Sequence, residues 1–296
     1  MGSPMKDRSK NSTVSTSVLR RTSQGSERTR DLLAAEEPLE IRLREEGGEA
    51  ERFVVTMRTP GDDEDLSVGL LFGEGVIVSA DEVVSVARPS DPRIDPDLAR
   101  NVAVVTLRPD VTRRERTPRR ATVIGSACGV CGRTSIDEVV ALAARCRAGQ
   151  SGGSMSPRPA LLRVPSSLLV RLPGLLRSEQ RGFEATGALH AAGLFEADGT
   201  LVLVREDVGR HNATDKAIGA RLRAGKAAPP ILVVSGRVGF EIAQKAALAG
   251  IAVVAAVSAP TSLAVEMADE AGLTLVGFLR GDTFNVYTHP ERIAEA

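Results

Sequence analysis

Two of the three cysteines in the sequence lie in the glycine-rich segment GSACGVCGRTS, residues 125–135. Cys128 and Cys131 have the C-x-x-C spacing, which occurs in zinc sites, in thiol–disulfide redox centres and around reactive thiols. Gly129 and Gly132 give the segment unusual backbone freedom, so we expect it to form a movable loop. A thiol on such a loop is suited to carrying a chemical group between two binding sites. The spacing therefore leaves a metal site, a redox switch and a carrier to be compared.

Zinc has the weakest support of the three. A closed tetrahedral site needs four ligands, and beyond the pair the sequence offers only Cys146 and three histidines. The zinc deaminases combine an H-x-E motif with a later P-C-x-x-C motif. Here the H-x-E motif begins at His289, after the cysteines, and Ala127 stands where the proline would be. We therefore expect no zinc and no other metal site.

A redox switch and a sulfur carrier are equally compatible with these residues. Two neighbouring thiols can close a disulfide, whereas a thiolate that attacks a persulfide becomes a persulfide and can hand on its terminal sulfur. An ordinary thiol with a pKa near 8.5 is only about 3% thiolate at pH 7. The capping-box spacing of Ser135 and Glu138 predicts that the next helix begins at Ser135. The N-terminal end of this helix and Arg133 both favour the thiolate.

The remaining sequence divides into a tail and two regions. Residues 1–35 are mostly polar and rich in serine, threonine and arginine, so we expect a disordered tail. Residues 36–115 alternate like half-buried strands around one helix, which predicts a β-β-α-β-β region. Residues 116–296, which include the cysteine loop 125–134, repeat a strand, loop and helix pattern. This repeat predicts an α/β region whose parallel sheet is covered by helices on both faces.

Two further residues of chemically active types are expected in the core. Cys146 lies on the apolar face of the helix after the cysteines, together with Ile136, Val139, Val140 and Ala143. His190, in the segment ALHAAG, is expected to be hydrogen-bonded within the core.

The composition excludes several classes of protein. Lys plus Arg and Asp plus Glu are equal at 38 each, so no overall field attracts nucleic acid or an anionic membrane. One tyrosine, seven phenylalanines and no tryptophan leave few platforms for stacking nucleic-acid bases. The longest apolar run, IAVVAAVSA, is too short to cross a bilayer, and residues 1–30 lack the apolar stretch of a signal peptide. Three cysteines argue against a secreted disulfide framework, so we expect a cytoplasmic protein with no membrane or nucleic-acid partner.

Polar loops follow the strands of the C-terminal region. In a parallel sheet, the loops that leave the carboxyl ends of the strands share one edge, where ligands bind. We therefore expect residues 206–212, 235–239, 258–262 and 277–285 to converge. His211, in the first of these loops, is either a cofactor contact or a structural residue.

Two of these loops carry small and basic residues that suit a phosphate. Ser235, Gly236 and Arg237 stand at a turn from strand to helix, where backbone N–H groups and the helix dipole can hold an anion. Ser258 and Thr261, in the segment SAPTS, should lie beside this turn. The five residues are therefore candidate ligand contacts.

Seven segments carry a resemblance to a known family: GSACGVCGRTS, TMRTPGDDEDLSVGLLFGEGV, TGALHAAGLFEADG, EDVGRHNATDKAIG, SGRVGFEIAQKAALAGI, VSAPTSLAVEMA and GFLRGDTFNVYT. They closely resemble the motifs of the FdhD family, the formate dehydrogenase accessory sulfurtransferases. The resemblance extends from about Glu37 to Arg292.

The resemblance implies a sulfur carrier, acting as a sulfurtransferase, that takes persulfide sulfur from a cysteine desulfurase. It would deliver the sulfur to the molybdenum cofactor in its bis-molybdopterin guanine dinucleotide form, a step needed for active formate dehydrogenase. The resemblance also implies a homodimer. Its main domain would be three-layered, α/β/α, and similar to the cytidine deaminase fold without the zinc site, beside a smaller N-terminal α+β region. A C-x-x-C thiol–disulfide oxidoreductase and a non-catalytic molybdenum-cofactor chaperone remain as alternatives.

The resemblance also assigns residues by motif. Cys128 matches the persulfide-bearing cysteine of the family, and Cys131 matches its companion. The segment that matches the family's cofactor-binding segment consists of Phe278, Leu279, Arg280, Gly281, Asp282 and Thr283. The sequence departs from the family pattern at Gly239, where serine is common, and at Thr214, where valine is common. Both changes are small and bear on local contacts only.

Overall fold

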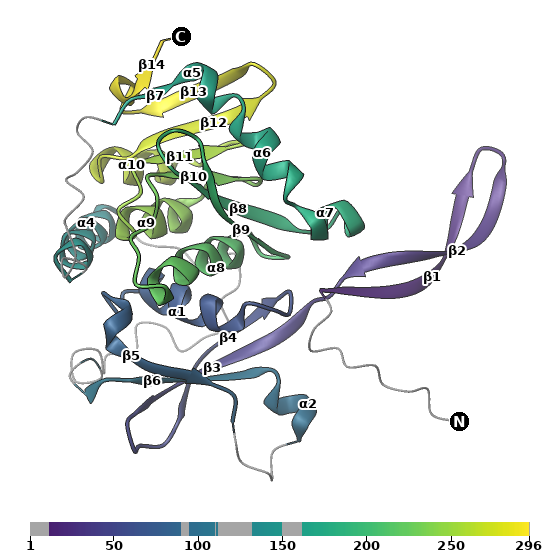
Figure 1. The fold of residues 1–296 in the computed structure, drawn as a ribbon, viewed down its shortest axis with the longest axis horizontal. Helices are drawn as coiled ribbons and strands as arrows, with labels where there is room; N and C mark the ends of the chain where they lie inside the picture. Colours follow the sequence, from purple (N-terminus) through teal and green to yellow (C-terminus); the bar gives the residue numbers. More distant parts are fainter. Residues whose placement is uncertain (1–11, 90–94, 110, 112–131, 150–161, 296) are drawn as a thin grey trace.

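The computed structural model describes residues 12–89, 95–109, 111, 132–149 and 162–295. The cysteine pair, Cys128 and Cys131, lies outside the described residues. The described chain is an α/β structure in which a four-stranded and a six-stranded sheet are the largest (Figure 1). None of its described helices is both long and apolar enough to cross a membrane.

A four-stranded sheet and one long helix form the N-terminal region. The strand order is β4-β3-β6-β5, with β6 parallel to β3 and the other neighbours antiparallel. The helix α1 contacts β5 and β6 and buries Leu66 and Phe72 completely. The predicted β-β-α-β-β order is confirmed, with two short helices added. The elements are β3 (Glu37–Glu45), β4 (Glu51–Arg58), α1 (Asp63–Gly73), η2 (Ala80–Glu82), β5 (Val83–Ala87), α2 (Pro96–Ala99) and β6 (Val102–Leu107).

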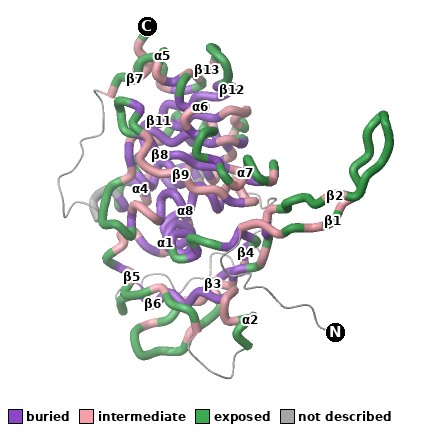
Figure 2. The backbone as a smooth tube through the Cα atoms, turned by 45° about the vertical axis from the view of Figure 1, so that its right-hand side comes forward, coloured by how far each residue is buried: buried purple, intermediate pink, exposed green. Residues whose placement is uncertain are grey.

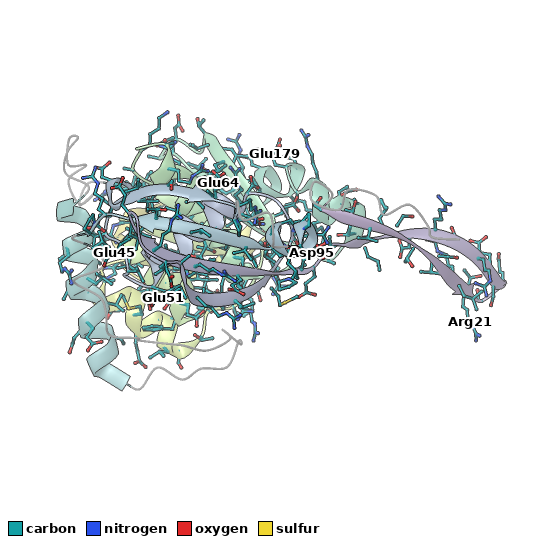
Figure 3. The ribbon with its side chains drawn as sticks, turned by 90° about the horizontal axis from the view of Figure 1, so that it is seen from below. Arg21, Glu45, Glu51, Glu64, Asp95 and Glu179 are labelled. Carbon is teal, nitrogen blue, oxygen red and sulfur yellow. The ribbon has the colours of Figure 1, made fainter. Side chains whose placement is uncertain are left out.

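Residues 13–34 form a hairpin, which we call the arm, where the sequence predicts a disordered tail. Its strands β1 (Thr13–Thr22) and β2 (Gly25–Ala34) pair along their full length as a separate sheet. The arm projects from the body of the molecule (Figures 1 and 2), and Figure 3 shows Arg21 at its far end. The prediction is wrong for these residues because a ribbon with a two-residue turn, whose first strand is rich in threonine and valine, satisfies its hydrogen bonds without an apolar core.

The C-terminal sheet is mixed, where the sequence predicts a parallel one. The strand order is β13-β12-β11-β10-β8-β9, in which β10, β11 and β12 are parallel while β8 runs antiparallel to both β10 and β9. The strand β8 is missing from the prediction because its alanines and glycine hide the strand pattern. Because β8 is antiparallel to both of its neighbours, β9 runs in the same direction as β10, β11 and β12. The strands are β8 (His190–Phe195), β9 (Leu201–Asp207), β10 (Ile231–Val234), β11 (Val253–Ala256), β12 (Thr274–Arg280) and β13 (Thr283–Thr288).

Helices pack against both faces of this sheet. Leu232 and Val234 of β10 join one apolar cluster with the helices of one face, while Ile231 and Val233 join a second cluster with Leu176 of the other. The likeness to the cytidine deaminase fold stays a prediction. The first face carries α4 (Gly132–Gly149), α8 (Arg210–Arg223), α9 (Phe240–Leu248) and α10 (Ser262–Glu270). The other face carries α5 (Ser166–Leu169) and α6 (Leu172–Ser178), which α7 (Arg181–Thr186) follows in the chain. The short strands β7 (Val164–Pro165) and β14 (Ile293–Ala294), with η3 (Pro290–Arg292) between β13 and β14, complete the described elements.

The helix after the cysteine pair is longer than predicted. It begins at Gly132 rather than at Ser135, because a capping-box spacing does not prevent a helix from starting earlier. Its apolar face is as expected, since Ile136 and Cys146 are buried in the main apolar cluster. The core position predicted for Cys146 is therefore confirmed.

The N-terminal region is fastened to the C-terminal sheet where α1 crosses α8. A Cβ atom on Gly69 would lie 1.9 Å from the backbone oxygen of Asp215, and one on Gly219 would lie 1.9 Å from that of Asp65. Only glycine permits two helix backbones to approach so closely. The main apolar cluster continues across this crossing, from Leu66 of α1 to residues of α8.

The crossing predicts an unusual effect of glycine-to-alanine substitution within a helix. We expect Gly219→Ala to lower the free energy of unfolding by about 1–3 kcal/mol, because the added methyl group forces the helices apart. Gly174→Ala in α6 is the control, since its Cβ would meet no atom within 4 Å and alanine has the higher helix propensity. Urea unfolding of the two variants checks this, and equal stability would contradict the crossing.

Candidate functional site

The four predicted loops converge at one edge of the C-terminal sheet, because β9, β10, β11 and β12 all end there. The backbone of Val238, after β10, forms a bridge with Pro260, after β11. The amide of Phe278, in β12, donates to the backbone oxygen of Ser258 at 3.0 Å. A Cβ on Gly236 would lie 3.1 Å from Nδ1 of His190 and 3.7 Å from Cβ of Arg210. The predicted convergence is confirmed, and we call this edge the ligand edge.

A cavity of about 600 Å³ opens beside the ligand edge. Four predicted contacts line it: Ser235, Leu279, Arg280 and Gly281. The opposite wall comes from α6 and α7, which the sequence analysis did not predict. That wall contributes Arg177, whose guanidinium carbon lies 4.7 Å from the ring centre of Phe183. The cavity therefore combines cationic and apolar surfaces.

The segment of residues 278–283 forms the turn between β12 and β13, where Arg280 pairs with Thr283. Phe278 has a φ of 53°, the left-handed region that side chains other than glycine rarely adopt, and a bulge interrupts the ladder beside it. The guanidinium of Arg280 lies 5.4 Å from its ring centre. Backbone strain of this kind collects at functional sites. Asp282 is exposed at the tip of the same turn.

The other predicted contacts differ in what they touch. The hydroxyl of Ser235 accepts from the amide of Ala191 at 2.9 Å, which fixes the turn after β10 to β8. The hydroxyl of Thr261 caps α10 by accepting from the amide of Ala264 at 3.3 Å. Arg237 is exposed at the ligand edge, outside the lining of the cavity. The structure therefore shows a cap for Thr261 and leaves Arg237 accessible to a ligand.

Three arginines of the ligand edge are not neutralised by carboxylates of the described residues. Within the described ranges, no carboxylate pairs with Arg210, Arg237 or Arg280. In the part of the chain that the structure describes, Nε of Arg210 is buried without a hydrogen-bond partner. The helices α8 and α9 begin beside them at glycine caps that leave the first N–H groups without a side-chain acceptor. Unpaired guanidinium groups and open helix N-termini suit an anionic ligand such as a phosphate.

The start of α1 shows the contrasting case. Asp63 receives Nε of Arg58 at 2.8 Å and also pairs with Arg88, while Asp65 receives Arg223 at 2.6 Å. Burial alone would raise the pKa of Asp63, but the two arginines hold it below its usual value. The acidic residues here line a cavity of about 330 Å³ together with the arginines that neutralise them. These contacts are structural.

Burial lowers the pKa of both histidines near the ligand edge and so favours the neutral imidazole. The helix α8 begins at Arg210, within the loop predicted for residues 206–212, so His211 lies in the first turn of the helix. Its Nδ1 is 3.1 Å from Oε2 of Glu241. Burial lowers the pKa of His211 to about 3, and the charges of Arg210 and Lys245 act in the same direction. A neutral imidazole that donates from Nδ1 to Glu241 presents Nε2 as an acceptor.

His190 is the residue that the sequence analysis placed wrongly. It is half-buried and lines the cavity, instead of lying in the core. Burial lowers the pKa of His190, and the positive charge of Arg210 lowers it further. No motif marks this role, because it depends on β8 lying between β9 and β10. Its place at the first position of β8 is the only signal, and that strand was not predicted.

Cys131 directly precedes Gly132, the first residue of α4, and both Cys128 and Cys131 lie outside the described residues. The described part of the chain holds no cluster of three or more potential metal ligands.

The environment of His211 predicts its titration. We expect its imidazole to stay neutral from pH 8 to pH 5, because its pKa is about 3 in the folded protein against an ordinary value of 6.5. The unfolded chain binds a proton that the folded chain does not, so the contribution of His211 to stability falls as the pH drops below 6.5. Imidazole NMR shifts measured against pH, with His211→Gln to assign the signal, check this. A midpoint near 6.5 would contradict it.

Comparison with known proteins places the chain in a family. The model of the FdhD/NarQ family matches residues 34–294. The sulfur carrier protein FdhD of Nocardia farcinica is 47% identical over 279 residues, covering 93% of each chain. That of Streptomyces avermitilis is 47% identical over 266 residues, covering 89% of each. A crystal structure of a candidate formate dehydrogenase accessory protein from Desulfotalea psychrophila has a similar fold, with a TM-score of 0.69, 22% identity, and coverage of 96% of this chain and 100% of that chain. This chain belongs to the FdhD/NarQ family.

Proposed function

We propose that this chain is a sulfur carrier for the maturation of formate dehydrogenase. In this proposal Cys128 takes sulfur from a cysteine desulfurase and delivers it to the molybdenum cofactor in its bis-molybdopterin guanine dinucleotide form. The observation that carries the proposal is the 47% identity, over 93% of the chain, to a protein named as a sulfur carrier. A homodimer in the cytoplasm is part of the same proposal.

The chemistry assigned to Cys128 is a transfer between sulfur atoms. Its thiolate attacks the terminal sulfur of the desulfurase persulfide, the sulfur–sulfur bond of the donor breaks, and the donor cysteine leaves as a thiolate. Cys128 then holds the persulfide until an electron pair of the reduced acceptor forms a bond to the terminal sulfur, the sulfur–sulfur bond breaks, and Cys128 leaves as a thiolate in turn. Cys131 directly precedes Gly132, where α4 starts, and a helix N-terminus lowers the pKa of a thiol close to it, which supports a reactive thiol in this cysteine pair.

The ligand edge supports the acceptor end of the proposal. A guanine dinucleotide carries phosphate groups, and Arg210, Arg237 and Arg280 lack carboxylate partners among the described residues. The cavity of about 600 Å³ offers a planar wall for a base, made by Phe183 and by Arg177, which stacks on it and pairs with Glu184. Cationic and planar groups side by side are what a nucleotide requires.

The sulfur-carrying step is tested by mass spectrometry of the intact protein. After incubation with a cysteine desulfurase and cysteine, we expect the wild-type protein and Cys146→Ala to gain one sulfur atom that a reductant removes. Cys128→Ala should gain none. Cys146 is the matched control because it is fully buried in the core. An unmodified wild-type protein would overturn the proposal.

The same variants separate the two alternatives. A thiol–disulfide oxidoreductase would form a Cys128–Cys131 bond under mild oxidant and carry no persulfide. A non-catalytic chaperone would support formate dehydrogenase activity in cells even as Cys128→Ala.

The acceptor end is tested with GDP as the probe. We expect Arg280→Ala to weaken GDP binding by about tenfold or more, since charge-assisted hydrogen bonds to phosphate are strong. Arg221→Ala is the matched control, because Arg221 is at the other end of α8, where it donates to the backbone oxygen of Ala227. Isothermal titration calorimetry measures both affinities. Equal affinities of the two variants would remove the turn between β12 and β13 from the binding site.

A further inference from the structure

Asp207 is a completely buried carboxylate at the last position of β9. Each of its oxygens has two partners. Oδ1 accepts from the amide of Gly209 at 2.9 Å and from Nδ2 of Asn212 at 3.1 Å. Oδ2 accepts from the amide of Thr59 at 3.1 Å and is 2.7 Å from Nζ of Lys216, which is 1% exposed. The negative charge is therefore neutralised and its oxygens are fully used.

The partners of Asp207 come from both regions of the molecule. Thr59 lies between β4 and α1, and its backbone oxygen also accepts from Nζ of Lys216 at 2.8 Å. Asn212 adds a second link, since Nδ2 also donates to the backbone oxygen of Met57 at 2.7 Å. The network thus joins the N-terminal region to the start of α8.

Such a network is costly for a purely structural purpose. Removing a carboxylate and an ammonium group from water costs several kcal/mol, and well-packed apolar residues often serve stability as well or better. What a charged network supplies in addition is a fixed direction for each hydrogen bond. The directions here converge on Gly209 and Asn212, which flank the first residues of α8.

Those first residues belong to the ligand edge. Arg210 and His211 lie between Gly209, whose backbone amide donates to Asp207, and Asn212, whose side-chain amide donates to it, so the chain is tied to Asp207 on both sides of them. Nε of Arg210 is buried and has no hydrogen-bond partner among the described residues, although the guanidinium group is a strong donor. Arg210 also lies against Gly236 of the neighbouring loop. A buried donor without a partner, at an open helix N-terminus, is available to an anion.

We infer that Asp207 is a positioning residue that holds the first turn of α8, and with it Arg210, in place for a phosphate group of the ligand. The identity of the ligand rests on the proposed function. Asp207 acts through the backbone of α8 and does not itself touch the ligand.

A double-mutant cycle with GDP tests this positioning. We expect Arg210→Ala to weaken GDP binding by about tenfold. Asp207→Asn should weaken it by about fivefold in the wild-type background and have no further effect in the Arg210→Ala background. A purely structural role of Asp207 would give the same loss in both backgrounds, or none in either, and would overturn the inference.

Asp215→Asn is the matched control. Asp215 is also a buried aspartate on α8, 2.6 Å from Nζ of Lys245, but it lies beyond the first turn. We expect this variant to lose stability while keeping GDP affinity. A loss of affinity as large as that of Asp207→Asn would overturn the inference, because any buried aspartate of α8 would then do the same.

A second readout does not need the ligand. Hydrogen exchange under native conditions should be faster for the amides of residues 209–212 in Asp207→Asn than in Asp215→Asn, while the strands of the sheet stay protected. If wild-type protein fails to bind GDP, the proposed nucleotide acceptor is wrong, and exchange alone decides the positioning. If Asp207→Asn does not fold, Asn212→Ala replaces it in both measurements, since it removes one bond to Asp207 and leaves the buried pair of Asp207 and Lys216 intact. Unchanged exchange at residues 209–212 would overturn the inference.

Discussion

The helices α1 and α8 touch backbone to backbone, and that contact fixes how the N-terminal region packs against the C-terminal sheet. Gly69 and Gly219 leave no room for a methyl group, so the crossing has one geometry. It brings the loop after β4 next to the end of β9, where Asp207 can reach Thr59. An apolar cluster alone would tolerate small shifts between the helices, whereas backbone contact together with directed hydrogen bonds does not. The N-terminal region thereby becomes part of the wall that supports the ligand edge.

Charge is divided unequally between the two sides of this contact. The acidic residues at the start of α1 neutralise arginines from both regions, as in the pair between Asp65 and Arg223. At the ligand edge, guanidinium groups remain without carboxylates among the described residues. The chain as a whole has 38 basic and 38 acidic residues, so this local excess is invisible in the net charge. An anion approaching the edge meets a field that the overall composition does not reveal.

The sequence predicts features that depend on neighbouring residues and misses those that depend on distant ones. The apolar strands β10 and β11 and the helices that follow them are readable from pattern, and so is the convergence of their loops. The strand β8 is not, because alanine and glycine at its start resemble a loop. The place of His190 in the cavity wall follows from that strand and was missed with it. The bond between Thr59 and Asp207 joins residues 148 positions apart, and no local spacing announces it.

The arm has a mechanical consequence. Only Ala35 and Glu36 separate β2 from β3, and β3 is an inner strand that pairs with both β4 and β6. Figure 1 shows the ribbon running from its free end straight into that sheet. A load applied at Arg21 is therefore carried along the polypeptide to β3 and from there to the loop after β4. A force on the free end of the arm therefore acts on the N-terminal sheet at the point where β3 begins.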